Sequence, residues 1–169
     1  RIISWYGVTH GLRWVSLRYF NAAGASNDSV LGENWDITTN LIPLVMKAAL
    51  GASGPVKVLG NDYPTPDGSA IRDYIHVCDL ARAHVQSLFF KQTNAVEILN
   101  LGVGRGFSVK EILDKFQKVI GRTISITYSP RRTGDIPAIW AVSNKAQHLL
   151  NWSCMYDADH ALEHAWRWV

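Results

Sequence analysis

Short runs of β-branched and aromatic residues alternate with amphipathic stretches along most of the chain, and this alternation restricts the fold more than any other feature. Residues 15–20 have the composition of a buried strand and lead into a turn of asparagine, alanine and glycine. Residues 40–50 carry Pro43 near the start and Gly51 after the end, an asymmetry typical of a helix. The order of such segments predicts a mixed α/β fold whose short strands need not all belong to one sheet.

Two further short strands are expected at residues 56–59 and 72–77, on either side of a turn-rich loop at residues 60–68. Asp79 can cap the helix that follows, because a carboxylate accepts hydrogen bonds from the free amides of a helix start. The apolar residues of this helix share one face, which we expect to pack on another element. They are Ala81, Val85, Leu88 and Phe89.

A capping box predicts the start of the next helix, since Ser108 and Glu111 have the required spacing. The apolar residues that follow recur at helical spacing, and Gly121 is placed to end the helix. The other expected elements are strands at residues 97–101 and 124–128 and helices at residues 145–150 and 158–168.

Composition and charge exclude two classes of partner. The chain is 47% hydrophobic and contains no apolar run of the roughly 20 residues that a membrane-spanning helix needs, so no membrane partner is expected. The net charge is +3, but the basic residues are scattered and the one tight pair is Arg131 with Arg132. A small anion therefore fits this chain better than nucleic acid does.

Length and cysteine placement set the remaining limits. The 169 residues suffice for one compact core, so residues 1–169 are expected to form a single unit. The chain starts at Arg1 without an initiator methionine or a leader, as an internal fragment would. Cys78 and Cys154 lie far apart without metal-ligand spacing, which predicts free thiols, no metal site and a cytoplasmic location.

Four motifs occur in a specific order and spacing. They are LRYFNAAG at residues 17–24, LGNDYPTPDG at 59–68, IRDYIHV at 71–77 and PRRTGD at 130–135. Together they resemble the UDP-glucose 4-epimerases of the extended short-chain dehydrogenase/reductase superfamily, and the second motif favours the 4-epimerases over their dehydratase relatives. The resemblance covers essentially the whole chain and implies the carboxy-terminal half of such an enzyme.

The resemblance implies the late part of a Rossmann-type sheet plus the small mixed α/β lobe that binds the UDP-sugar, with the amino-terminal NAD-binding half absent. A whole enzyme of this kind interconverts UDP-glucose and UDP-galactose through a 4-keto intermediate, with NAD as cofactor. None of the six tyrosines has a lysine four residues later, so the Tyr-x-x-x-Lys pair of the family is missing. We interpret the glycine-rich residues 102–106 as a turn, and expect this chain alone to hold no NAD, to contain no catalytic residue and to be inactive.

The resemblance assigns two arginines to the diphosphate. Arg72 and Arg132 match the family's phosphate-binding positions, where a planar guanidinium donates forked hydrogen bonds. The alternative is a structural ion pair, of Arg72 with Asp73 and of Arg132 with Asp135. Asp135 itself matches the position that hydrogen-bonds the uridine ribose, with a loop-capping carboxylate as its alternative.

Other residues match contacts to the sugar, the base and the cofactor. Positions that touch the sugar and phosphate are matched by Asn21, Asn40 and Leu41, although asparagines beside turns and helix starts are also ordinary caps. The strand that lies along the uracil is matched by Lys57, Val58 and Leu59. The strand end that faces the nicotinamide is matched by Tyr19, Phe20 and Ala22, of which the two aromatic residues would also make good core residues.

Ile139 matches a position beside the sugar that acts as a gate for N-acetylated substrates, and the alternative is that its side chain points into the core. Two other readings of the whole chain stay open. It could be a truncated, non-catalytic binding or interaction module, or part of a related UDP-sugar oxidoreductase. The strands at 15–20 and 97–101 would lack neighbours in a truncated chain, which predicts a homodimer or other self-association.

Overall fold

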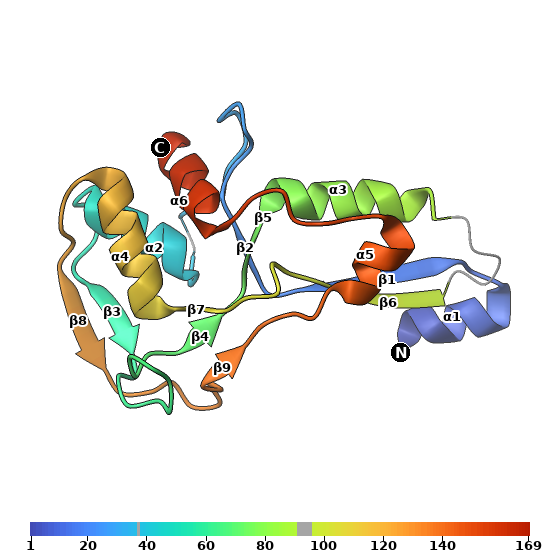
Figure 1. Ribbon diagram of the computed structural model, residues 1–169, viewed down its shortest axis with the longest axis horizontal. Helices are drawn as coiled ribbons and strands as arrows, with labels where there is room; N and C mark the ends of the chain where they lie inside the picture. Colours follow the sequence, from blue (N-terminus) through green and yellow to red (C-terminus); the bar gives the residue numbers. More distant parts are fainter. Residues whose placement is uncertain (37, 91–95) are drawn as a thin grey trace.

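The computed structural model describes residues 1–36, 38–90 and 96–169 as two lobes joined by short strands (Figure 1). Helices and strands alternate along the chain, and three of the sheets consist of one parallel strand pair each. The mixed α/β class expected from the sequence is therefore confirmed. The expectation that the short strands need not share one sheet is confirmed as well, since the strands of the described residues are divided among four sheets.

The first lobe is built on a parallel pair formed by β1 (Trp14–Tyr19) and β6 (Val96–Leu101). Its core lies between this pair and the helices α3 (Val77–Leu88) and α5 (Asn144–Leu150). The fully buried residues of this core include Ile75, Leu99, Leu101, Ala146 and Trp152. The helix α1 (Ile2–His10) precedes β1 and contributes no buried residue.

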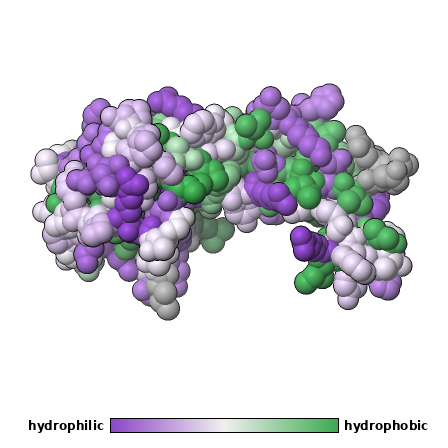
Figure 2. Space-filling model, turned by 90° about the horizontal axis from the view of Figure 1, so that it is seen from below, coloured by the Kyte–Doolittle hydropathy of each residue, from purple (hydrophilic) through white to green (hydrophobic). Residues whose placement is uncertain are grey.

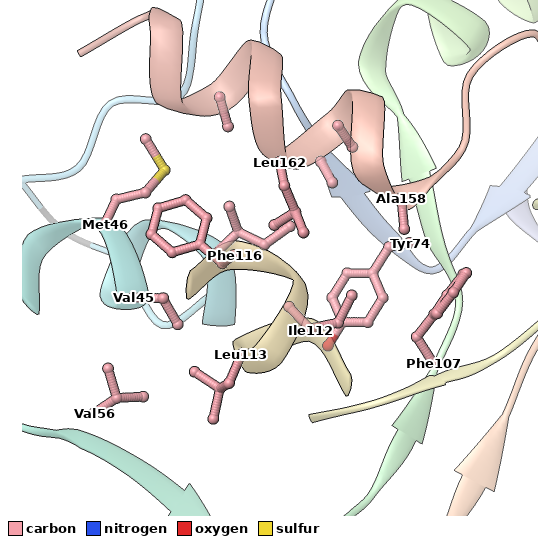
Figure 3. Packing of buried hydrophobic residues seen from close by; sticks show 14 of the residues in the cluster. Val45, Met46, Val56, Tyr74, Phe107, Ile112, Leu113, Phe116, Ala158 and Leu162 are labelled. Carbon is pink, nitrogen blue, oxygen red and sulfur yellow. The ribbon is translucent and has the colours of Figure 1, made fainter. Parts of the chain in front are cut away.

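The second lobe pairs β3 (Val56–Leu59) with β8 (Ile126–Ser129), again in parallel. Three helices enclose its core, namely α2 (Leu41–Ala49), α4 (Val109–Ile120) and α6 (Ala158–Arg167). Figure 3 shows Phe116 in the middle of this core, with Leu162 and Met46 beside it. The capping box of Ser108 and Glu111 is confirmed, and Gly121 ends α4 in the left-handed conformation at φ 66°.

Short strands connect the lobes. The parallel pair of β2 (Asn21–Ala23) and β5 (Tyr74–His76) continues from the first lobe toward the second. Beside it, β4 (Ile71–Arg72) lies between β7 (Phe107–Ser108) and β9 (Ala138–Ile139). The expected strand at residues 72–77 is therefore split into β4 and β5, which belong to different sheets.

Two expectations for α3 are wrong. The helix begins at Val77, and its amino-terminal cap is His76, whose Nδ1 accepts a hydrogen bond from the Cys78 amide. Asp79 does not act as the cap, because its buried carboxylate accepts hydrogen bonds from Met155 and Tyr156 instead. The apolar face that we expected to pack is exposed in the described part of the chain: Ala81, Val85, Leu88 and Phe89 all face solvent.

Like α3, the helix α1 exposes large apolar side chains to solvent. Ile2, Trp5 and Val8 are large apolar residues of α1, and each is more than 70% exposed. In Figure 2, which views the molecule from below, α1 projects at the right of the first lobe with apolar surface beside it. Across residues 1–36, 38–90 and 96–169, no helix has the length and apolar content needed to cross a membrane.

Candidate functional site

A cleft of about 270 Å³ opens where the start of α2, the strands β3 and β4 and the loop at residues 130–135 meet. It collects all the substrate-binding residues predicted from the sequence except Val58 and Ile139. The predicted residues that line it are Asn21, Asn40, Leu41, Lys57, Leu59, Arg72, Arg132 and Asp135. The cleft thus brings together segments that are far apart in the sequence.

One carboxylate holds the two arginines at the wall of the cleft. Arg132 donates a hydrogen bond of 2.9 Å to Asp135 Oδ1, and Arg72 Nη2 lies 3.7 Å from the same oxygen. The hydrogen bond that Arg132 donates to Asp135, and the negative charge of this carboxylate, raise the pKa of the Arg132 guanidinium. With Lys57, the described lining carries three cationic side chains and one carboxylate. The cleft is therefore suited to a small anion with more than one negative charge.

The alternative roles of the two arginines have different outcomes. The ion pair of Arg132 with Asp135 is present, as the structural alternative proposed. Arg72 does not pair with Asp73, whose carboxylate instead accepts backbone amides. Arg131 lies outside the cleft lining, where it donates a 2.7 Å hydrogen bond to Asp62 Oδ1.

The two asparagines are held by partners that the sequence analysis missed. Asn21 donates both its backbone amide and its side-chain Nδ2 to the main-chain oxygen of Asp73, at 3.1 and 3.2 Å. Asn40 stands at the amino-terminal cap position of α2 but makes no side-chain cap bond. Its Nδ2 donates instead to Glu33 Oε1 at 2.9 Å. No sequence motif indicates Glu33, which lies in a loop seven residues earlier in the chain.

The strand β3 divides its residues between the cleft and the core. Lys57 and Leu59 line the cleft, whereas the Val58 side chain is buried in the second lobe. Only the backbone of Val58 could therefore contact a bound base. Ile139 is half-buried in β9, where it pairs in register with Arg72 of β4, and it does not line the cleft. Its role as a gate stays a prediction.

The three residues expected to face a nicotinamide lie apart from the cleft. Tyr19 and Phe20 are 45% and 37% exposed at the end of β1, so their alternative role as core residues is wrong for the described structure. Ala22 borders a separate cavity of about 480 Å³, together with Gly24 and Cys78. Both cysteines are free, as expected, and burial raises the pKa of Cys154 to about 12. In the described ranges no cluster of three or more His, Cys, Asp or Glu residues could hold a metal ion.

The sequence and the fold of this chain match those of known epimerases. The profile of the NAD dependent epimerase/dehydratase family matches residues 1–102. The chain is 46% identical over 164 residues to a UDP-glucose 4-epimerase of Rhizobium meliloti, a match that covers 96% of this chain and 50% of the relative. It is 42% identical over 170 residues to a UDP-glucose 4-epimerase of Lacticaseibacillus casei, covering 99% of this chain and 51% of that one.

A solved structure gives the same result. The crystal structure of UDP-glucose 4-epimerase from Bifidobacterium longum in complex with NAD⁺ and UDP superimposes with a TM-score of 0.93 at 39% identity. The match covers 99% of this chain and 50% of that structure. The chain thus spans about half the length of the curated relatives it matches. These coverage figures do not confirm the carboxy-terminal placement expected from the motifs.

The family assignment follows from the extent of these matches. The family profile covers more than half of the chain, and the fold matches a solved epimerase over nearly the whole chain. Three of the four motifs, at residues 17–24, 59–68 and 71–77, lie inside the matched profile. The chain belongs to the NAD dependent epimerase/dehydratase family.

Proposed function

We propose that this chain is the UDP-sugar-binding portion of a UDP-glucose 4-epimerase. The observation that carries the proposal is the single cleft that collects the predicted substrate residues from segments as distant as β2 and the loop at 130–135. Arg72 and Arg132 bind the diphosphate, which their net positive surroundings favour. Asp135 binds the ribose, and the backbone of β3 lies along the uracil together with the side chains of Lys57 and Leu59.

The remaining cleft residues, Asn21, Asn40 and Leu41, contact the sugar and the phosphate. In the whole protein, NAD takes a hydride from the sugar at C4 and returns it to the other face. Tyr19 and Phe20 each expose an aromatic ring at the end of β1, where the family resemblance expects the nicotinamide. However, the amides of Val103 and Gly104 in the glycine-rich loop already bind Asp73, so they are not available to a pyrophosphate. We therefore do not expect this chain alone to hold NAD.

The proposal predicts that the isolated chain binds UDP and that Arg72→Gln weakens this binding roughly tenfold, because a charge-assisted hydrogen bond to phosphate is lost. Isothermal titration calorimetry of both proteins measures the effect. Arg122→Gln is the matched control, since Arg122 bonds the Ala49 carbonyl outside the cleft. A wild-type chain that does not bind UDP, or an Arg72→Gln variant with unchanged affinity, would contradict the proposal.

A second candidate function, a non-catalytic binding or interaction module, is favoured by the apolar faces of α1 and α3. In the described structure β1 pairs with β6 alone, and parallel strands are normally covered on both faces. A related UDP-sugar oxidoreductase would share the cleft and stays an alternative. The cytoplasmic location and the absence of nucleic-acid and membrane partners stay predictions.

These exposed faces predict that the isolated chain forms a homodimer or another self-associated species, because large exposed apolar side chains favour association. Sedimentation velocity over a range of concentrations measures the mass. Leu88→Lys on α3 should reduce association, since Leu88 is 81% exposed, whereas Val142→Lys, at a comparably exposed residue outside α1 and α3, should not. A chain that stays monomeric at the highest concentration would contradict the prediction.

A further inference from the structure

Asp73 belongs to the motif at residues 71–77 and has a fully buried side chain, and the proposed function gives it no contact with the substrate. It lies between β4 and β5 and has an exposed fraction of 0%. Its Oδ1 accepts the Val103 amide at 3.1 Å, and its Oδ2 accepts the amides of Gly104 and Ala141 at 3.3 and 3.1 Å. Among the described residues, no ion pair involves this carboxylate.

These hydrogen bonds join three of the four sheets at one residue. Val103 and Gly104 follow the end of β6, which belongs to the sheet of the first lobe. Ala141 follows β9, which pairs with β4. The main-chain oxygen of Asp73 accepts two hydrogen bonds from Asn21, the first residue of β2. Asp73 therefore fixes the relative positions of strands that share no sheet.

Asp73 does not line the cleft, but the residues that it holds do. Arg72 precedes it in the chain, Tyr74 follows it, and Asn21 bonds its carbonyl; all three line the cleft. We propose that Asp73 is the positioning residue of the nucleotide site, which sets the places of Arg72 and Asn21 by binding the loops after β6 and β9. This inference rests on the proposed function, because it names a residue that acts on the same cleft.

The packing around Asp73 offers an independent way to disturb the same contact. A Cβ atom added at Gly102 would lie 2.4 Å from Asp73 Oδ2 and 2.5 Å from the Ala141 side chain. Both distances are too short for real atoms, so the carboxylate or Ala141 must move, and either movement disturbs the hydrogen bond between them. The φ angle of Gly102 is not in the left-handed region, so Gly102→Ala acts through this clash and not through backbone strain.

Asp79 provides a matched control for Asp73. Its side chain is also fully buried, and it accepts the amides of Met155 and Tyr156 at 3.0 and 3.1 Å. It also bonds Arg82, and it does not line the cleft. Asp79→Asn therefore removes a carboxylate of similar burial and similar amide partners from a place that should not affect nucleotide binding.

The test compares UDP affinity of the wild-type chain with that of Asp73→Asn, Gly102→Ala and Asp79→Asn, alongside their thermal stabilities. Asp73→Asn and Gly102→Ala should each weaken UDP binding about tenfold, since a displaced Arg72 loses about one charge-assisted hydrogen bond to the phosphate. Asp79→Asn should leave the affinity within about twofold, whatever it does to the stability. Uridine affinity, measured by NMR titration, should change less than UDP affinity in Asp73→Asn and Gly102→Ala. The reason is that Arg72 and Asn21 act on the phosphate groups and the sugar attached to them, which uridine lacks.

A measurement on the wild-type chain avoids dependence on variants that fail to fold. On addition of UDP, the NMR signals of the Val103, Gly104 and Ala141 amides should shift although these residues lie outside the cleft, and those of Met155 and Tyr156 should not. The inference is overturned if none of the three amide signals shifts. It is also overturned if Asp73→Asn and Asp79→Asn weaken UDP affinity equally. If Asp73→Asn has the UDP affinity of the wild-type chain, this inference alone is overturned. If the wild-type chain binds no UDP, the proposed function is overturned as well.

Discussion

Purified alone, the chain is expected to show no interconversion of UDP-galactose and UDP-glucose, even with NAD added. None of its six tyrosines is followed four residues later by a lysine, so the pair that exchanges a proton with the sugar hydroxyl is missing. General acid and base catalysis alone contributes roughly 10²- to 10⁴-fold to such a reaction. If the chain also holds no NAD, as we expect, the hydride acceptor is missing in addition, so turnover should fall below detection.

A coupled assay for UDP-glucose formed from UDP-galactose measures this result. The full-length relative from Lacticaseibacillus casei serves as the positive control under the same conditions, because it is a UDP-glucose 4-epimerase 42% identical to this chain. UDP affinity of the same preparation shows that the chain is folded and that its cleft is functional. Measurable turnover by the pure 169-residue chain would refute the prediction.

The parts of the fold that were predicted from the sequence are those fixed by local interactions. The strand expected at residues 56–59 coincides with β3, because its alternating residues and flanking turns are adjacent in the sequence. The capping box joins Ser108 and Glu111, whose amides and side chains lie within one helical turn. The left-handed end of α4 likewise needs Gly121 itself and no distant partner.

The misassigned elements depend on contacts between distant residues. Aspartate is a residue type that favours helix caps, but the Asp79 carboxylate accepts a hydrogen bond from the amide of Met155, 76 residues later in the chain. The cap is then left to His76, which local preferences do not favour. The apolar stripe of α3 has helical spacing, but spacing alone does not say whether a partner covers it. Leu80 and Ala83 of the same helix pack into the core of the first lobe instead.

The candidate site shows the same division. Arg72, Arg132 and Asp135 were identified through a family resemblance, since ion pairs and loop caps would produce the same residue types. Glu33 and Asp73, which hold the two asparagines, were not identified. Their contacts with Asn40 and Asn21 run through loops and a main-chain oxygen, and such contacts have no sequence pattern. Residues that hold the binding residues in place, such as Glu33 and Asp73, can therefore be identified only when the fold is known.

Acid should destabilise the chain between about pH 6.5 and pH 4 because of a buried histidine pair. His76 Nδ1 accepts the Cys78 amide, so the proton of a neutral ring is on Nε2, which lies 3.0 Å from His164 Nδ1. His164 Nδ1 accepts a hydrogen bond from this N–H group only when Nδ1 itself carries no proton. Protonation of either ring would place two N–H groups opposite each other. Burial, followed by repulsion from His164, lowers the pKa of His76 from 6.5 to about 4.

The charged and titratable groups around the pair do not reverse this direction. Asp79 raises the pKa of His76 and His160 lowers it, and both effects are smaller than that of burial. Tyr156 stacks on the His76 ring with 4.3 Å between centroids. The pKa of His164 is lowered as well, first by burial and then by Arg167, while Glu163 opposes the shift.

The sign follows from proton binding. Between about pH 4 and pH 6.5 the unfolded chain binds a proton at residue 76 and the folded chain does not, so stability rises with pH. The contribution of His76 is complete above its unfolded pKa of 6.5 and is lost as the pH falls toward 4. A shift of this size corresponds to about 3 kcal/mol of unfolding free energy, or more than a hundredfold in the folding equilibrium.

Urea unfolding at a series of pH values from about 7.5 to about 4.5 measures the slope. His76→Asn should flatten it, because asparagine can still cap α3 but does not titrate. His148→Asn, at an exposed histidine, should leave the slope unchanged. Carboxylates with a lowered pKa, such as Asp157, lose their contribution only below the ordinary value of 3.8, outside this window. An unfolding free energy that stays constant from pH 6.5 to pH 4.5, or a His76→Asn variant with the wild-type slope, would show that the histidine pair is not the acid-sensitive element.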